Sequence, residues 1–190
     1  MGVARVDAMT LTEFLEWEER QETKYEFDGF EPVAMVGVTR AHAVIQRNLM
    51  FALTGRLLGK SCEPFGGELK VEVAGRIRYP DAFVVCTPGA DTDKVITDPV
   101  VIFEILSKES GHRDRVTKNE EYRLTPSVQR YVMLEQDAPA ATVFAREGDR
   151  WVETLLKGDA ILSMPEIGIE VPLVEFYEGL TFAADEQPAA

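Results

Sequence analysis

Two short apolar runs, each carrying one carboxylate, constrain the fold of this chain more than any other feature. The first run is residues 78–85 (RYPDAFVV) and the second is residues 100–107 (VVIFEILS). Apolar runs rich in β-branched residues are typical of strands buried on both faces. An ionised carboxylate in such a strand costs several kcal/mol unless it is paired or holds a metal. We therefore interpret Asp81 and Glu104 as carboxylates that two paired strands aim at one divalent ion.

Each acid taken alone has a plainer interpretation. Asp81 could begin a strand after a turn at Pro80, and Glu104 could form a structural ion pair. The two acids lie 23 residues apart (104 minus 81), and each interrupts an apolar run. This repetition favours a shared site, since perturbed acids gather at functional sites.

The rest of the pattern predicts three helices and several short strands. Thr10 and Glu13 form a capping box, which predicts a helix to about Gln21. Apolar residues at intervals of three and four predict a long helix over 40–58, with His42 at one end of its buried stripe. A short helix is expected over 113–124, and a final helical turn is expected at 173–177. Besides the two central runs, strands are expected at 24–27, 31–36, 62–64, 68–73, 128–134, 141–145, 151–156 and within 161–171.

This order of elements predicts an α/β (α+β) sandwich with a mixed central β-sheet flanked by helices, an N-terminal helix and hairpin, and C-terminal β-hairpins. A right-handed crossover would place the strand at 128–134 beside the strand that carries Glu104. The segment 88–99 is rich in Gly, Asp, Thr and Pro and is expected to be a surface loop. We expect one domain over residues 1–184 and a disordered tail at 185–190.

Composition indicates a globular protein of the cytoplasm. Hydrophobic residues make up 45% of the chain and charged residues 28%, and no run is apolar enough for a membrane span or a signal peptide. Cys62 and Cys86 have no metal-ligand spacing, so we expect buried, reduced thiols, with a disulfide between them as the alternative. Walker, Gly-x-Ser-x-Gly, His-Glu-x-x-His and CxxC motifs are absent from the sequence, which argues against the usual nucleotide hydrolases, esterases, zinc proteases and thiol oxidoreductases.

An ordered set of short motifs resembles the PD-(D/E)XK nuclease superfamily and, within it, the bacterial Uma family of restriction-endonuclease-like proteins. The resemblance extends from about Met9 to about Leu180. The motifs are Tyr25-Glu26-Phe27-Asp28-Gly29, His42, Pro80-Asp81, Phe103-Glu104-Ile105-Leu106-Ser107, Asp114, Lys118 and Tyr122.

The resemblance implies a restriction-endonuclease-like fold and a Mg²⁺- or Mn²⁺-dependent endonuclease. Asp81 and Glu104 would hold the ion together with the backbone carbonyl of Ile105. The superfamily has Lys two residues after the strand glutamate, where this chain has Leu106, and the resemblance implies that Lys118 takes over the catalytic lysine's role. The implied supporting residues are Glu26, His42, Asp114 and Tyr122.

The supporting residues also have structural alternatives. Glu26 could be an exposed strand acid, and His42 could be a core residue with satisfied hydrogen bonds. Asp114 and Lys118 are spaced for a surface ion pair on a helix, which would contribute only a few tenths of a kcal/mol. Tyr122 could pack beside Lys118 or orient it.

The net charge of −13 opposes nucleic-acid binding at long range. Six basic residues nevertheless flank the two acids, and we interpret them as a local basic rim on an acidic body, which is compatible with nucleic acid without being evidence for it: Arg76, Arg78, Lys108, Arg113, Arg115 and Lys118. The first functional hypothesis, a metal-dependent endonuclease, takes DNA as the substrate. A homodimer or higher homo-oligomer is expected, since two-fold symmetry matches a duplex. The alternative function is a nuclease-fold module that has lost turnover and acts in protein interaction or regulation.

Overall fold

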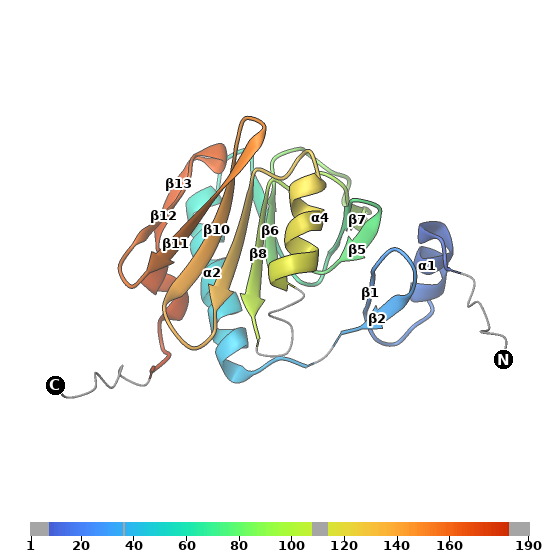
Figure 1. Cartoon of the computed structure of the whole chain (residues 1–190), viewed down its shortest axis with the longest axis horizontal. Coiled ribbons are helices and arrows are strands. Elements are labelled where there is room, and N and C mark those ends of the chain that lie inside the picture. Colours follow the sequence, from blue (N-terminus) through green and yellow to red (C-terminus); the bar gives the residue numbers. More distant parts are fainter. Residues whose placement is uncertain (1–7, 36, 108–113, 183–190) are drawn as a thin grey trace.

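The computed structural model describes residues 8–35, 37–107 and 114–182, with only the backbone described at 114 and 115. A six-stranded sheet forms the body of the molecule, and a five-stranded sheet connects that body to the N-terminal helix (Figure 1). The long helix α2 (Arg40–Leu57) lies on one face of the six-stranded sheet, and the short helix α4 (Asn119–Leu124) lies on the other (Figure 1).

The six-stranded sheet carries the second of the two acidic runs at its centre. Its strands, in spatial order, are β11 (Arg150–Lys157), β10 (Ala140–Glu147), β9 (Arg130–Glu135), β8 (Val101–Leu106), β6 (Ala82–Val85) and β3 (Glu63–Gly66). β8 and β9 run parallel, while the other neighbouring pairs are antiparallel. The mixed central sheet flanked by helices is therefore confirmed, and α4 lies in the crossover between the two parallel strands.

The five-stranded sheet is built from short strands in the first half of the chain. Its order is β2 (Pro32–Ala34), β1 (Tyr25–Phe27), β5 (Arg76–Arg78), β4 (Lys70–Val73) and β7 (Val95–Ile96). Helix α1 (Leu11–Glu18) begins at the predicted capping box and ends three residues before the expected Gln21. It packs on this sheet through Phe14, whose ring stacks on that of Phe27 with centroids 4.9 Å apart.

Side chains of β8 alternate between two cores. Phe103 and Ile105 pack on the α2 side, together with the hairpin β12 (Ile161–Met164) and β13 (Ile169–Pro172) and the 3₁₀ helices η2 (Pro165–Ile167) and η3 (Leu173–Tyr177). Ile102 and Leu106 pack on the α4 side. The strand is therefore buried on both faces, as its composition predicts.

The first acidic run is not one strand, which corrects the expectation for Asp81. Residues 76–78 form β5 of the five-stranded sheet, whereas residues 82–85 form β6 of the six-stranded sheet. Tyr79, Pro80 and Asp81 make the passage between the two sheets. Pro80 has no N–H to donate to a ladder, which gives a physical reason for the break. Asp81 consequently lies directly before the first residue of β6 and not inside a strand.

The expectation of reduced cysteines is wrong. Cys62 and Cys86 form a disulfide with their Cα atoms 3.9 Å apart. The antiparallel register of β3 and β6 pairs Glu63 with Val85, so the next pair outward brings Cys62 opposite Cys86. The sequence alone did not reveal this because the register of the two strands is a tertiary property.

Other boundaries differ little from expectation. The segment expected as a loop at 88–99 contains the two-residue strand β7, which pairs with β4. The helix expected over 113–124 begins, within the described residues, as a π-helical turn, η1 (Asp114–Lys118), and continues as α4. The predicted tail at 185–190 lies outside the described residues. Among the residues that are described, no helix combines the length and apolar character needed to cross a membrane.

Candidate active site

Glu104 is a buried carboxylate in the middle of β8. Its neighbours Phe103 and Ile105 face α2, so the strand's alternation directs Glu104 to the α4 side. The residue is 4% exposed. Its Oε1 atom accepts hydrogen bonds from the Tyr122 hydroxyl at 2.7 Å and from the Lys118 ammonium at 2.9 Å. One continuous helical segment therefore supplies a neutral and a charged donor to the same carboxylate oxygen.

Asp81 caps the end of the central ladder and contacts the long helix. β6 and β8 pair Ala82 with Phe103, and one step further in this register Asp81 comes opposite Glu104. The Oδ2 atom of Asp81 accepts the backbone N–H of Ile105 at 2.6 Å. Its Oδ1 atom lies 2.8 Å from Nε2 of His42 at the start of α2. The peptide between Glu104 and Ile105 thus follows one acidic residue in β8 and donates its N–H to the other, Asp81, which directly precedes β6.

Lys118 is buried between two carboxylates that are far apart in the sequence. Its Nζ atom lies 2.9 Å from Glu104 and 3.1 Å from Oε1 of Glu26 on β1. Lys118 ends the π-helical turn η1, and π-turns inside helices are frequent at functional sites. The surface pair of Asp114 with Lys118 was the structural alternative, and the side chain of Asp114 lies outside what the structure describes.

Glu26 belongs to the site from the five-stranded sheet. Besides Lys118, it has Arg78 at 3.8 Å and the backbone N–H of Tyr79 at 3.4 Å. Burial by itself would raise the pKa of the Glu26 carboxyl. The charges of Lys118 and Arg78 and the two hydrogen bonds outweigh this effect and lower that pKa. Glu26 is therefore a buried, ionised partner of Lys118 and not an exposed strand acid.

Tyr122 is a neutral hydrogen-bond donor to Glu104 and not a phenolate. Complete burial and the charge of Glu104 raise the pKa of the Tyr122 hydroxyl well above its usual value of 10.0. The hydroxyl therefore remains a donor at any physiological pH, and its bond to Glu104 fixes the orientation of that carboxylate.

Arg78 and Glu121 connect β5 to α4 beside the site, and the sequence did not reveal this role. Arg78 is fully buried, and it donates from Nε and Nη2 to both oxygens of Glu121 on α4, each at 2.7 Å. Arg76 also reaches Glu121, at 3.1 Å. A signal was present, because Arg78 interrupts an apolar segment close to Asp81 and Glu121 follows Lys118 by one helical turn.

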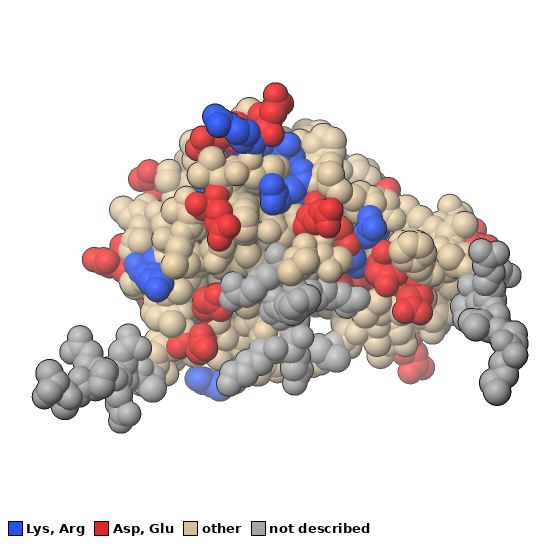
Figure 2. All heavy atoms as spheres, in the orientation of Figure 1, with Lys and Arg blue, Asp and Glu red and all other residues tan. Residues whose placement is uncertain are grey.

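These contacts change the picture of a basic rim. Arg78 and Lys118 are buried in ion pairs, so they do not belong to a surface rim. Lys108 and Arg113 lie outside the described residues, as does the side chain of Arg115. Acidic and basic side chains are interspersed on the face drawn in Figure 2.

The site brings acidic and basic side chains together. Among the described residues it contains four carboxylic acids and three basic side chains: Glu26, Asp81, Glu104 and Glu121, and Arg76, Arg78 and Lys118.

The donor set is compatible with a hydrated magnesium or manganese ion. Among the described residues, no three His, Cys, Asp or Glu side chains gather as a potential metal cage. Mg²⁺ does not require one, because it usually binds through one or two carboxylates and keeps several waters. Asp81 accepts the backbone N–H of Ile105, the residue after Glu104, and the two carboxylates are of the oxygen-ligand type that this ion prefers.

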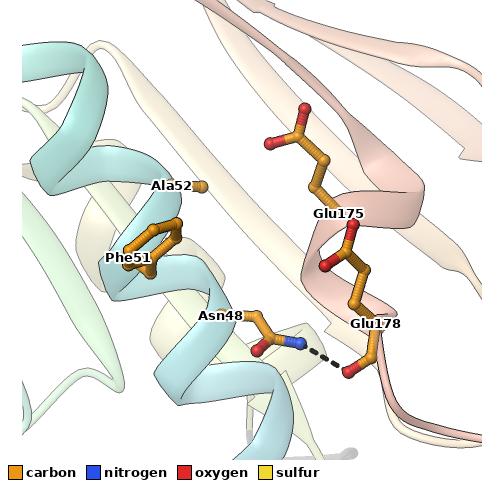
Figure 3. Close-up of a pocket in the computed structure, with 5 residues that line it drawn as sticks. All are labelled: Asn48, Phe51, Ala52, Glu175 and Glu178. Carbon is orange, nitrogen blue, oxygen red and sulfur yellow. Dashed lines mark hydrogen bonds between the residues drawn. The ribbon is translucent and has the colours of Figure 1, made fainter.

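A pocket elsewhere in the molecule does not adjoin this site. It lies between α2 and η3 and is lined by Asn48, Phe51, Ala52, Glu175 and Glu178 (Figure 3). Asn48 closes one side by donating from Nδ2 to the backbone carbonyl of Glu178 at 2.9 Å (Figure 3). Phe51 follows His42 by nine residues, which is roughly 13 Å along a helix at ~1.5 Å per residue.

The architecture is a mixed α+β fold that a solved structure shares. It matches a crystal structure described as "a putative nuclease belonging to DUF820" from Anabaena variabilis ATCC 29413, with a TM-score of 0.74 and 18% sequence identity. The match covers 89% of this chain and 97% of the other. At this identity the likeness concerns the fold, which agrees with the predicted fold class.

The family follows from the sequence itself. Residues 11–173 match the Uma2 family, described as "Putative restriction endonuclease", and the chain belongs to this family. Two uncharacterized proteins of Synechocystis sp. (strain PCC 6803) are similar over most of their length. The protein slr1290 is 29% identical over 174 residues, which is 90% of this chain and 92% of the relative. The protein sll1609 is 28% identical over 165 residues, which is 84% of this chain and 93% of the relative.

Proposed function

We propose that the protein is a Mg²⁺- or Mn²⁺-dependent endonuclease that hydrolyses phosphodiester bonds, with DNA as the substrate. The observation that carries this proposal is that Asp81 accepts the backbone N–H of Ile105, the residue next to Glu104, while the Lys118 ammonium lies 2.9 Å from Glu104. Membership in a restriction-endonuclease family supports the same reaction class.

In this proposal Asp81, Glu104 and the backbone carbonyl of Ile105 hold the ion. When bound, a divalent ion acidifies a coordinated water and polarises the phosphoryl oxygen. His42 holds Oδ1 of Asp81, so the carboxylate has one preferred orientation.

Lys118 provides the positive charge that Leu106 cannot provide. Its ammonium is placed beside Glu104, where it can stabilise the negative charge that develops on the phosphate oxygens. The Glu26 carboxylate lies 3.1 Å from the same ammonium and is its second counter-charge. Tyr122 donates to the same Glu104 oxygen, Oε1, as the lysine does.

The second candidate is an interaction or regulatory module without turnover. The observation that favours it is the closed pairing of Lys118 with Glu26 and Glu104, which a purely structural ion-pair network would also show. The net charge of −13 points the same way.

A cleavage assay with matched variants separates the two functions. Supercoiled and linear DNA, and RNA of the same sequence, would be incubated with the protein in Mg²⁺, in Mn²⁺ and in EDTA. We expect metal-dependent cleavage of DNA that is lost in Asp81→Asn and in Glu104→Gln. Glu153→Gln, on the exposed strand β11, is the matched control and should cleave like the parent. Absence of cleavage by the parent on any substrate, together with no Mn²⁺ binding by calorimetry, would establish the second candidate.

A further inference from the structure

We propose that the buried ion pair of Arg78 and Glu121 is a positioning element that holds Lys118 against Glu104 and Glu26. Its consequence for catalysis rests on the proposed nuclease function, whereas its effect on Lys118 does not. In the contacts described for Arg78 and Glu121 their partners are one another, Arg76, Glu26 and the backbone, so the proposed action runs through Lys118 and its partners.

The Arg78 guanidinium joins three parts of the molecule. It extends from β5, binds both oxygens of Glu121 on α4, and donates from Nη1 to the backbone carbonyl of Phe27 on β1 at 2.9 Å. The side chain is fully buried, and Glu121 is 4% exposed. A planar guanidinium with two parallel bonds to a carboxylate fixes direction as well as distance.

Arg78 is bonded both to α4, which continues the helical segment of Lys118, and to β1, which carries Glu26. Glu121 follows Lys118 by three residues, so the two side chains leave the same side of the helical segment. Phe27 follows Glu26 directly, and the guanidinium also lies 3.8 Å from Glu26 itself. Arg78 therefore anchors both the helical segment from which Lys118 extends and the strand β1, whose Glu26 carboxylate forms an ion pair with Lys118.

The helix requires such an anchor. α4 has six residues, and helices of this length are not stable in water without tertiary contacts. In the described part of the chain, Glu121 connects α4 to the five-stranded sheet through ion pairs with Arg78 and Arg76.

Stability alone does not account for a pair of this kind. A buried ion pair can often be replaced by apolar residues of similar volume without loss of stability, because burial of both charges is costly. What such a replacement loses is the direction imposed by the two parallel hydrogen bonds. This distinction allows positioning to be separated from folding by experiment.

The test measures the chemical accessibility of Lys118. The parent and the double variant Arg78→Met/Glu121→Leu would be treated with formaldehyde and a borohydride reagent, and methylation of each lysine would be read by peptide mass spectrometry. Exposed Lys157 serves as the internal reference. We expect Lys118 to be protected in the parent and its methylation rate to rise at least tenfold in a double variant that melts within a few degrees of the parent.

A matched control pair joins β9 of the six-stranded sheet to η2. Arg130 also binds both oxygens of a glutamate, Glu166, and both side chains are mostly buried. Arg130→Met/Glu166→Leu should leave the methylation of Lys118 unchanged. Glu121→Gln is the second test variant, since it keeps the shape of the side chain if the double variant does not fold. Unchanged protection of Lys118 in either folded variant of the Arg78 pair would overturn the proposal.

The kinetics of cleavage provide an independent test of the positioning role. If the protein is a nuclease, the double variant should lose at least tenfold in kcat with little change in KM, and Arg78→Lys should recover only part, because an ammonium cannot bind both oxygens in parallel. If the parent cleaves nothing, the proposed nuclease function fails, and the methylation result still decides whether Arg78 and Glu121 position Lys118.

Discussion

Nε2 of His42 lies 2.8 Å from Oδ1 of Asp81, and this contact joins the long helix α2 to the junction of the two sheets. Gln46, one turn further along α2, donates from Nε2 to the backbone carbonyl of Asp81 at 2.9 Å. The helix therefore holds both the side chain and the backbone of the residue proposed as a metal ligand.

His42→Ala should weaken Mn²⁺ binding by about 10–100-fold, the range typical for the loss of a residue that orients a metal ligand. Calorimetric titration with Mn²⁺ measures the effect. Arg47→Ala, an exposed residue of the same helix, is the control and should bind like the parent. Equal affinity of the parent and His42→Ala would remove His42 from the site.

Lys118→Ala should abolish cleavage while leaving Mn²⁺ binding in place, since the lysine would stabilise the transition state and not hold the ion. Asp81→Ala should lose both. Single-turnover cleavage together with calorimetry separates the two effects. Cleavage by Lys118→Ala at the parental rate would show that Lys118 has no catalytic role.

Tyr122→Phe should lower the free energy of unfolding by about 1–3 kcal/mol, because it removes a buried donor to the Glu104 carboxylate. Urea denaturation followed by circular dichroism provides the measurement. A change below about 0.5 kcal/mol would mean that another donor replaces the Tyr122 hydroxyl.

Glu26 should make the protein sensitive to acid. Its pKa in the folded state is lowered below the usual 4.5, so its stabilising contribution is complete above about pH 4.5 and is lost as the pH falls through the lower folded value. Melting temperatures of the parent and Glu26→Gln should therefore differ at pH 7 and converge below pH 4.5. A constant difference over this range would contradict the ion pair with Lys118.

Reduction of the disulfide should lower the melting temperature. The bridge between Cys62 and Cys86 closes a loop with a sequence separation of 24, for which chain entropy gives about 3 kcal/mol. In a chain of this size that corresponds to about 6–12 °C. Scanning calorimetry with and without dithiothreitol tests this, and Cys62→Ser/Cys86→Ser should be insensitive to the reductant.

Local pattern was sufficient for most elements of the fold. The capping box at Thr10 and Glu13 predicted the start of α1, and the spacing of apolar residues predicted α2 to within one residue. The apolar run around Glu104 became β8, buried on both faces. These features depend on residues that are close in the chain, so periodicity and capping chemistry reveal them. The position of Asp81 and Glu104 in apolar runs, together with the family motifs, also marked them as candidate site residues.

Only the tertiary structure decided how these residues are connected. The division of the Asp81 run between two sheets, the disulfide of Cys62 with Cys86, and the burial of Arg78 against Glu121 all depend on strand register and on which sheet a strand joins. A one-residue change of register would move these side chains to other neighbours, and sequence periodicity does not specify the register between distant strands. Arg78 therefore looked like a surface cation in the sequence, and in the folded protein it is a fully buried partner of Glu121.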